Sequence, residues 1–248
     1  MEDEGRWVFN RLADAYRARP GYPEALVDRL AELAGGAGAR VADLGAGTGF
    51  LALPLAARGL KVAAVEPARA MLDVLRAGLG SSGGVELVHS AAEATPLAAA
   101  SYDLVLLGEA LQWVDPELTG REAARLLRPG GVCAVVETAF ADTPFLRALS
   151  ALLAKVNRKA RPRPPGALRQ LLSLATGAAR IEEERFVHEV LLEGEALDQV
   201  LHSFSYVGPA MGAAKLSEVT AEARRLAVTH GGARWRRELT LRFSRLIP

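Results

Sequence analysis

Short apolar runs alternate with amphipathic segments over the first 138 residues of the chain. The runs have the length of buried strands, and the apolar residues between them recur at helical spacing. This alternation predicts βαβ units, and hence a parallel sheet with right-handed crossovers. Pro129-Gly130-Gly131 is expected to end the last helix. The strands are expected at 40–44, 61–65, 85–89, 102–107 and 132–136, with helices around 26–33, at 68–77 and from 115 to about 127.

The charge composition and the hydrophobic pattern of the sequence change after Glu137. Residues 143–181 contain eight Lys or Arg residues and no Asp or Glu. The pattern then predicts an alternating segment at 185–192 and helices near 195–204 and 216–229. A final segment, 235–245, alternates with period two, as an antiparallel strand does. We therefore expect one α/β domain with an insertion between its fifth and sixth strands.

Composition and charge narrow the class of protein. The 30 basic and 29 acidic residues give a net charge of +1, so no general attraction to nucleic acid is expected. A single cysteine, Cys133, excludes an intrachain disulfide framework, and the four scattered histidines lack metal-ligand spacing. No apolar run approaches the roughly 20 residues that span a bilayer, and the acidic start, MEDEGRW, lacks the features of a signal peptide. We expect a cytoplasmic protein without a metal, nucleic-acid or membrane partner.

A glycine-rich turn follows the first predicted strand. Gly45 and Gly47 allow the backbone to turn tightly and a ligand to approach closely. Glu66 comes 17 residues after Gly49, at the end of the next strand. Because the carboxyl ends of parallel strands meet at one edge, its carboxylate is expected beside the turn, where it can accept hydrogen bonds from both hydroxyls of a ribose.

The spacing of the glycines in this turn and the charge of Asp43 distinguish a dinucleotide from other ligands that contain a ribose. A dinucleotide site uses G-x-G-x-x-G before a helix that faces a pyrophosphate. Here the third glycine comes one residue early, and Asp43 places a negative charge at the turn, which suits a cationic ammonium. The turn therefore predicts a ligand with a ribose and a positively charged amino-acid end, S-adenosylmethionine, and disfavours an NAD-dependent oxidoreductase.

Motifs of one known family occur along the chain in that family's order. By these motifs the chain resembles the class I S-adenosylmethionine-dependent methyltransferases over nearly its whole length. The motifs are Asp43-Leu-Gly-Ala-Gly-Thr-Gly49, Glu66-Pro67, Ala92-Glu-Ala-Thr-Pro-Leu97 before Ser101-Tyr-Asp-Leu-Val105, and Leu127-Arg-Pro-Gly-Gly131. Three further segments are similar to the small-molecule branch that includes trans-aconitate methyltransferase-like proteins: Tyr16-Arg-Ala-Arg-Pro-Gly-Tyr-Pro23, Ala110-Leu-Gln-Trp-Val-Asp115 and Ser203-Phe-Ser-Tyr206.

The resemblance implies a fold and a division of the chain. The fold is a Rossmann-like, doubly wound α/β structure with a mostly parallel seven-stranded sheet, a late antiparallel strand and a helical lid insertion after strand five. Residues 1–248 then form a single methyltransferase domain. Its parts are an N-terminal helical arm at 1–35, a cofactor-binding core at 36–138, the lid insertion at 139–184, and C-terminal strands and cap helices at 185–248.

The resemblance also implies which residues hold the cofactor. One group surrounds the methionine part, another holds the ribose and adenine, and the arm closes over the site. Many relatives carry an Asp that contacts the adenine amine where this chain has Ala91, so weaker selection is expected there. The methionine part is assigned to Asp43, Gly45, Ala46, Gly47, Gly49 and Gly108, the ribose and adenine to Glu66, Pro67, Met71, Ala92 and Glu93, and the arm contacts to Tyr16 and Arg19.

Methyl transfer needs a general base only when the acceptor arrives protonated. Relatives of this branch often have His before the Trp, whereas this chain has Gln112, which can orient an acceptor but cannot take its proton. Two explanations are open: the acceptor is already anionic, or Glu109, His202 or Tyr206 deprotonates it. Trp113 and Tyr206 are expected to contact the acceptor.

The basic stretch at 143–181 favours an acidic acceptor if it covers the cofactor's methyl end, although a solvated lid would have the same composition. We expect transfer to a small molecule, to O rather than N or C, by a monomer or homodimer. The alternative is a protein that binds S-adenosylmethionine without transferring methyl, as a cyclase or regulatory module. Methylation of nucleic acid or protein is disfavoured, because the chain has no N/D-P-P-[YF] motif and no appended recognition domain.

Overall fold

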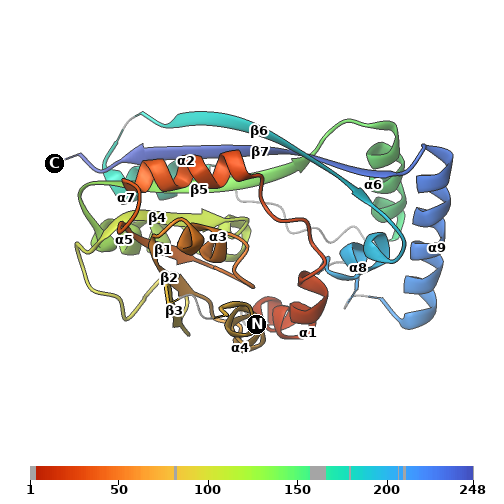
Figure 1. Cartoon of the computed structure of the whole chain (residues 1–248), viewed down its shortest axis with the longest axis horizontal. Coiled ribbons are helices and arrows are strands. Elements are labelled where there is room, and N and C mark those ends of the chain that lie inside the picture. The colour runs from red at the N-terminus through yellow and green to blue at the C-terminus, as the bar shows by residue number, and fades with distance from the viewer. Residues whose placement is uncertain are drawn as a thin grey trace. The chain divides into compact units, whose positions relative to one another are not determined.

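A computed structural model describes residues 4–80, 83–156, 166–178, 180–205, 207–208 and 211–247. Seven strands form one sheet in the order β3-β2-β1-β4-β5-β7-β6 (Figure 1). The strands are β1 (Arg40–Leu44), β2 (Lys61–Val65), β3 (Val85–Val88), β4 (Tyr102–Gly108), β5 (Leu127–Phe140), β6 (Glu182–Leu192) and β7 (Ala233–Arg245).

The first five strands pair in parallel, as the alternating pattern predicts. β1 lies between β2 and β4, with Asp43 opposite Ala64 on one side and Leu106 on the other. β2 also pairs with β3, and β4 with β5. The parallel, Rossmann-like part of the predicted fold is therefore confirmed.

The last two strands complete a mixed sheet. β7 runs antiparallel to β5: the N–H of Ala141 donates to the carbonyl of Arg236 at 3.0 Å, and the N–H of Leu246 donates to that of Gly131 at 2.8 Å. β6 pairs with β7 at the edge of the sheet. The sequence predicted one late antiparallel strand, and the structure has antiparallel strands at both C-terminal positions.

One predicted helix end is wrong. α5 (Pro116–Leu126) stops before Pro129-Gly130-Gly131, and these residues lie inside β5. Leu127 is already opposite Tyr102 of β4, where the register then shifts by a bulge. Cross-strand pairing with β4 and β7 thus overrides the local tendency of Pro and Gly to form a turn.

Helices fill the connections between strands. α5 begins after Asp115, whose Oδ1 accepts hydrogen bonds from the N–H groups of Glu117 and Leu118 at 2.8 and 2.9 Å, as an N-cap does. The others are α1 (Glu4–Tyr16), α2 (Glu24–Ala34), α3 (Ala52–Ala57), α4 (Arg69–Gly78), the short 3₁₀ helix η1 (Leu111–Trp113), α6 (Pro144–Val156), α7 (Ala167–Thr176), α8 (Ala196–His202) and α9 (Ala213–Thr229).

The chain forms two compact units. Unit 1 comprises Met1–Gly21, Thr138–Arg161 and Val187–Glu238, and unit 2 comprises Tyr22–Glu137, Pro162–Phe186 and Leu239–Pro248. The region predicted as a lid, 139–184, is therefore divided, with α6 in unit 1 and α7 in unit 2. α7 is a core helix of unit 2: its Leu171 and Leu172 are fully buried, and an added Cβ on Gly120 of α5 would lie 2.9 Å from the Leu171 carbonyl oxygen.

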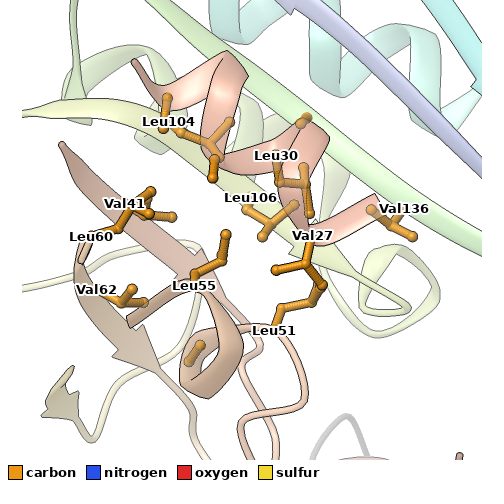
Figure 2. Close-up of a cluster of buried hydrophobic side chains, with 14 of the residues drawn as sticks. Val27, Leu30, Val41, Leu51, Leu55, Leu60, Val62, Leu104, Leu106 and Val136 are labelled. Atoms are coloured by element: carbon orange, nitrogen blue, oxygen red, sulfur yellow. The ribbon is translucent and has the colours of Figure 1, made fainter. Parts of the chain in front are cut away.

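Both faces of the sheet in unit 2 are buried. Val41, Leu104 and Val136 point to the face covered by α2 and α3, where Figure 2 shows them beside Leu30 and Leu55. The intervening residues of the strands point to the other face, which α5 and α7 cover. A strand that is buried on both faces has apolar residues at nearly every position. The short apolar runs in the sequence therefore predicted the strands of unit 2.

Unit 1 has its own core. Apolar residues of α6, α8, α9 and β7 form one cluster, in which Trp235 is 2% exposed. The Phe140 ring lies edge-on to the Trp235 ring at 4.9 Å, and the Phe204 ring stacks on Trp235 at 6.1 Å.

Candidate cofactor site

The candidate site lies in unit 2, where the ends of β1, β2 and β4 meet. β1 and β4 are neighbours, but the chain leaves β1 toward β2 and leaves β4 toward β5. Ligands of open α/β sheets bind in the crevice outside such a reversal point. The two loops touch here, because an added Cβ on Gly45 would lie 2.8 Å from the Cβ of Ala110.

The glycines of the turn have different roles. Gly47 has φ +56°, and an added Cβ there would meet no described atom within 4 Å, so the backbone borders open space that a ligand can enter. Gly49 has φ +89°, and an added Cβ would lie 2.2 Å from Cδ1 of Leu75 on α4. Gly49 thus packs closely against α4, and its contact with the cofactor stays a prediction.

Glu66 lies beside the turn, as its position after β2 predicts. Its Oε2 accepts a hydrogen bond from the Gly47 N–H at 2.9 Å, and its Oε1 accepts one from the Ala68 N–H at 2.8 Å. The residue is 7% exposed. A carboxylate has about four lone-pair positions, so Glu66 can hold the turn and still accept hydrogen bonds from ribose hydroxyls.

Asp43 is the most unusual group of the site. It is 2% exposed, and its Oδ2 has no hydrogen-bond partner among the described residues. Burial raises the pKa of Asp43 from 3.8 to about 7, and the nearby Glu66 carboxylate adds to the rise. A buried carboxylate without a partner is costly unless a ligand supplies one. The ammonium of S-adenosylmethionine would supply a cation and N–H donors, so the residues present fit this cofactor.

Other predicted cofactor residues are less accessible. Met71 is 1% exposed, so its side chain does not form an open wall in the structure. Ala92 is 3% exposed, and its expected contact with the adenine is made by its backbone. Glu93 is half-buried, and its Oε1 accepts a hydrogen bond from the Asp115 N–H at 3.1 Å. Pro67 is half-buried, and its carbonyl lies 3.0 Å from Nε2 of His89.

The end of β4 forms the other side of the crevice. An added Cβ on Gly108 would lie 2.5 Å from Cδ1 of Leu51 and 3.2 Å from Oη of Tyr22, so the backbone here packs closely against these two side chains. Sequence reasoning did not assign a role to Tyr22. The signal was present, because Tyr22 belongs to the quoted segment Tyr16–Pro23.

The loop after Gly108 contains a strained residue. Glu109 has φ +55°, a conformation that costs a non-glycine residue on the order of 1–3 kcal/mol and that clusters at functional sites. Its N–H donates to the carbonyl of Val136 at 3.0 Å. Gln112 donates from Nε2 to the Glu109 carbonyl at 2.8 Å, and its buried Oε1 has no partner in the described part of the chain. Trp113 is half-buried beside it. Gln112 thus has a fixed amide whose oxygen can accept a hydrogen bond.

The remaining predicted residues belong to unit 1. The Arg19 guanidinium lies 3.9 Å from the centre of the Tyr16 ring and donates to Oγ and the carbonyl of Ser203 at 2.8 and 2.9 Å. In the part of the chain that the structure describes, Arg19 has no carboxylate partner. His202 is half-buried at the end of α8, and Tyr206 lies outside the described residues.

Two other features are absent from the described residues. No group of three or more His, Cys, Asp or Glu side chains is arranged to hold a metal ion. None of the described helices has both the length and the apolar character needed to cross a membrane.

Comparisons with known proteins agree with this geometry. Residues 42–135 match the family model described as "Methyltransferase domain". The chain is 48% identical over 124 residues to an uncharacterised methyltransferase of Mycobacterium tuberculosis, which is 50% of this chain and 49% of that protein. It is 34% identical over 142 residues to a malonyl-[acyl-carrier protein] O-methyltransferase of Enterobacter lignolyticus, which is 56% of this chain and 55% of that protein. A solved structure from Anaeromyxobacter dehalogenans, described as a proposed type II methyltransferase, superposes with a TM-score of 0.62 at 26% identity, covering 93% of this chain and 99% of that one.

Residues 42–135 therefore match a methyltransferase domain, and the fold is similar to that of a solved methyltransferase structure over most of the chain. The chain spans about half the length of the mycobacterial relative that it matches. The narrower likeness to trans-aconitate methyltransferase-like proteins stays a prediction.

Proposed function

We propose that this protein transfers a methyl group from S-adenosylmethionine to an oxygen of a small-molecule acceptor, with an acidic metabolite as the first acceptor to test. The observation that carries the proposal is the buried oxygen of Asp43, unpartnered among the described residues, beside the open turn at Gly47. We propose that it acts in the cytoplasm as a monomer or homodimer, and that nucleic acid and membranes are not its partners.

Different side chains of the protein bind different parts of the cofactor. Glu66 accepts hydrogen bonds from the ribose hydroxyls, and Asp43 receives the ammonium. Arg19, whose guanidinium lies over the Tyr16 ring, is the proposed partner of the methionine carboxylate. When bound, the cofactor supplies a methyl group on a positively charged sulfur, activated for in-line displacement. The protein has to place the acceptor and exclude water.

Gln112 is the proposed orienting group for the acceptor. Its amide nitrogen is held by the Glu109 carbonyl, so its oxygen has a defined direction. An amide takes up no proton at neutral pH, which suits an acceptor that arrives as a carboxylate. The relative named as a malonyl-[acyl-carrier protein] O-methyltransferase supports transfer to oxygen. Glu109, His202 and Tyr206 are the candidate bases for an acceptor that arrives protonated, and Trp113 and Tyr206 are proposed acceptor contacts.

The cofactor assignment is tested by replacing Glu66. We expect Glu66→Ala to weaken S-adenosylmethionine binding by about 1–3 kcal/mol, because the ribose hydroxyls lose a charged acceptor. Glu66→Gln should lose less, since its amide oxygen still accepts. Glu86→Ala is the matched control, because Glu86 is exposed on the neighbouring strand β3. Calorimetric titration measures all three, and an unchanged affinity in folded Glu66→Ala contradicts the assignment.

The rival function is cofactor binding without transfer, in a cyclase or regulatory module. Both functions predict binding of S-adenosylhomocysteine. Only the methyltransferase releases S-adenosylhomocysteine from S-adenosylmethionine when a panel of small acids, alcohols and phenols is added. Binding of the cofactor with no turnover on any panel member favours the rival, whereas stabilisation by NAD alone contradicts both.

A further inference from the structure

A cavity of unit 2 lies next to the loop that contains Gln112, on the face of the sheet that α7 covers. Its volume is about 290 Å³. Residues from the end of β5, from β7, from η1 and from the first turn of α7 line it: Leu111, Glu137, Gly166, Ala167, Leu168, Arg169 and Arg242.

The charges on the strand side of the cavity neutralise one another. Arg242 of β7 makes an ion pair with Glu137 of β5 and donates from Nε to Glu183 at 2.8 Å. Glu183 also pairs with Arg185. A ligand therefore meets a satisfied ion pair on this side, which offers little net charge to either a cation or an anion.

Among the described residues, the helix side of the cavity has one charge without an ion-pair partner, that of Arg169. Arg169 itself is exposed. The N–H groups at the start of α7 have no side-chain cap, because Gly166 holds the N-cap position. Leu111, Ala167 and Leu168 supply apolar surface between Arg169 and the strands. This combination suits a molecule with an apolar body and a negative charge at one end.

The cavity borders the proposed acceptor position. Leu111 precedes Gln112 in η1. The N–H of Glu109 donates to the carbonyl of Val136 at 3.0 Å, and Val136 precedes Glu137 in β5. One wall of the cavity is thus continuous with the loop that holds the Gln112 amide.

We propose that this cavity is a subsite for a small molecule with an apolar body and a carboxylate at one end, which binds at Arg169. That the occupant is the methyl acceptor rests on the proposed function, while occupation of the cavity itself does not. Arg169 is not a catalytic residue: it anchors this carboxylate away from the Gln112 loop, so an acceptor bound here receives the methyl group on a second carboxylate, beside Gln112.

Benzoate and benzamide are a suitable pair of probes, because they have the same shape and differ in charge. Titration of each into the full-length ¹⁵N-labelled protein, followed by NMR, should shift the amide signals of Leu111, Ala167 and Leu168 with benzoate. We expect benzamide to bind at least about tenfold more weakly, since it lacks the charge that Arg169 pairs with. Equal binding of the two probes, or benzoate shifts confined to other parts of the protein, overturns the proposal.

Variants of Arg169 complete the test. Arg169→Glu should weaken benzoate binding at least about tenfold, whereas Arg169→Lys should keep it within a few fold. The control is Arg245→Glu, which makes the same charge change at an exposed arginine that donates to the Gly130 carbonyl near the start of β5. Benzoate affinity that is indifferent to Arg169→Glu contradicts the subsite.

The same variants separate this proposal from the proposed function. S-adenosylhomocysteine affinity, measured by calorimetry, should be unchanged in Arg169→Glu, because Asp43 and Glu66 are untouched. Failure of S-adenosylhomocysteine to bind wild-type protein contradicts the proposed function, yet leaves benzoate binding as a complete test of the cavity. Failure of benzoate to bind the wild type overturns the subsite alone.

Discussion

Replacing Asp43 with asparagine should stabilise the protein at alkaline pH relative to acidic pH. In the folded protein the pKa of Asp43 is raised to about 7, mainly by burial, against 3.8 for an exposed carboxyl. Between these values the folded state holds a proton that the unfolded state has lost, so the contribution of Asp43 to stability falls as the pH rises from about 4 to about 7. Above pH 7 Asp43 is ionised in both states, and the protein then bears the full free-energy cost of burying its charge.

The size of the effect follows from the same two values. One pKa unit corresponds to about 1.4 kcal/mol, so the raised pKa of Asp43 costs about 4 kcal/mol of stability at pH 8, where the folded protein carries it ionised, and about 2 kcal/mol at pH 5, where the folded protein carries it protonated. The buried amide that the substitution introduces has its own cost, but that cost does not change with pH. The stability of Asp43→Asn minus that of wild type should therefore increase by about 2–3 kcal/mol between pH 5 and pH 8.

Urea unfolding at pH 5, 6, 7 and 8 measures this difference, with Asp14→Asn as the control because Asp14 is exposed on α1. The variant should also bind S-adenosylhomocysteine more weakly, since the ammonium loses its charged partner. A stability difference that does not vary with pH would refute the burial of an unpaired carboxylate. A gain in stability with undiminished affinity would refute the assignment of Asp43 to the ammonium.

Three further predictions concern the same crevice. Gly49→Ala should destabilise the protein by at least about 2 kcal/mol in urea unfolding, because the new Cβ would overlap Leu75 and the backbone has a positive φ; a neutral result contradicts the packing. Glu109→Gly should relieve the strain of φ +55° and raise the melting temperature by a few degrees, and an unchanged or lower value contradicts the strain. With a carboxylate acceptor, the pH–rate profile should lack a basic limb near neutrality, because no proton has to leave before transfer; a limb near pH 7 identifies an additional base, which His202→Ala tests first.

Much of unit 2 could be predicted from the sequence because its signals are local. Strands buried on both faces are apolar throughout, and Gly45, Gly47 and Glu66 follow strands at the spacing that brings them to one edge. The sequence-based placement of Glu66 beside the turn is confirmed by its hydrogen bond to Gly47. Its role in binding ribose stays a prediction.

What could not be predicted depends on partners far away in the sequence. β6 begins at Glu182, three residues before the predicted segment, with acidic residues that resemble a loop. Their charges are met by arginines from other elements: Glu184 binds Arg29 of α2 at 2.9 Å, and Glu183 binds Arg242 of β7. The strained φ of Glu109 and the cavity beside α7 likewise arise only from three-dimensional packing.

The interleaved order of the two units has a consequence for synthesis of the protein. Unit 2 contains β1 to β4 and most of β5 early in the chain, but the part of β7 that covers β5 comes from Leu239–Arg245. The ribosome therefore makes 138–161 and 187–238, which belong to unit 1, before the sheet of unit 2 can be completed. Until then the edge of β5 that pairs with β7 is unpaired. An unpaired strand edge can pair with other chains and aggregate, and chaperones bind such exposed surfaces.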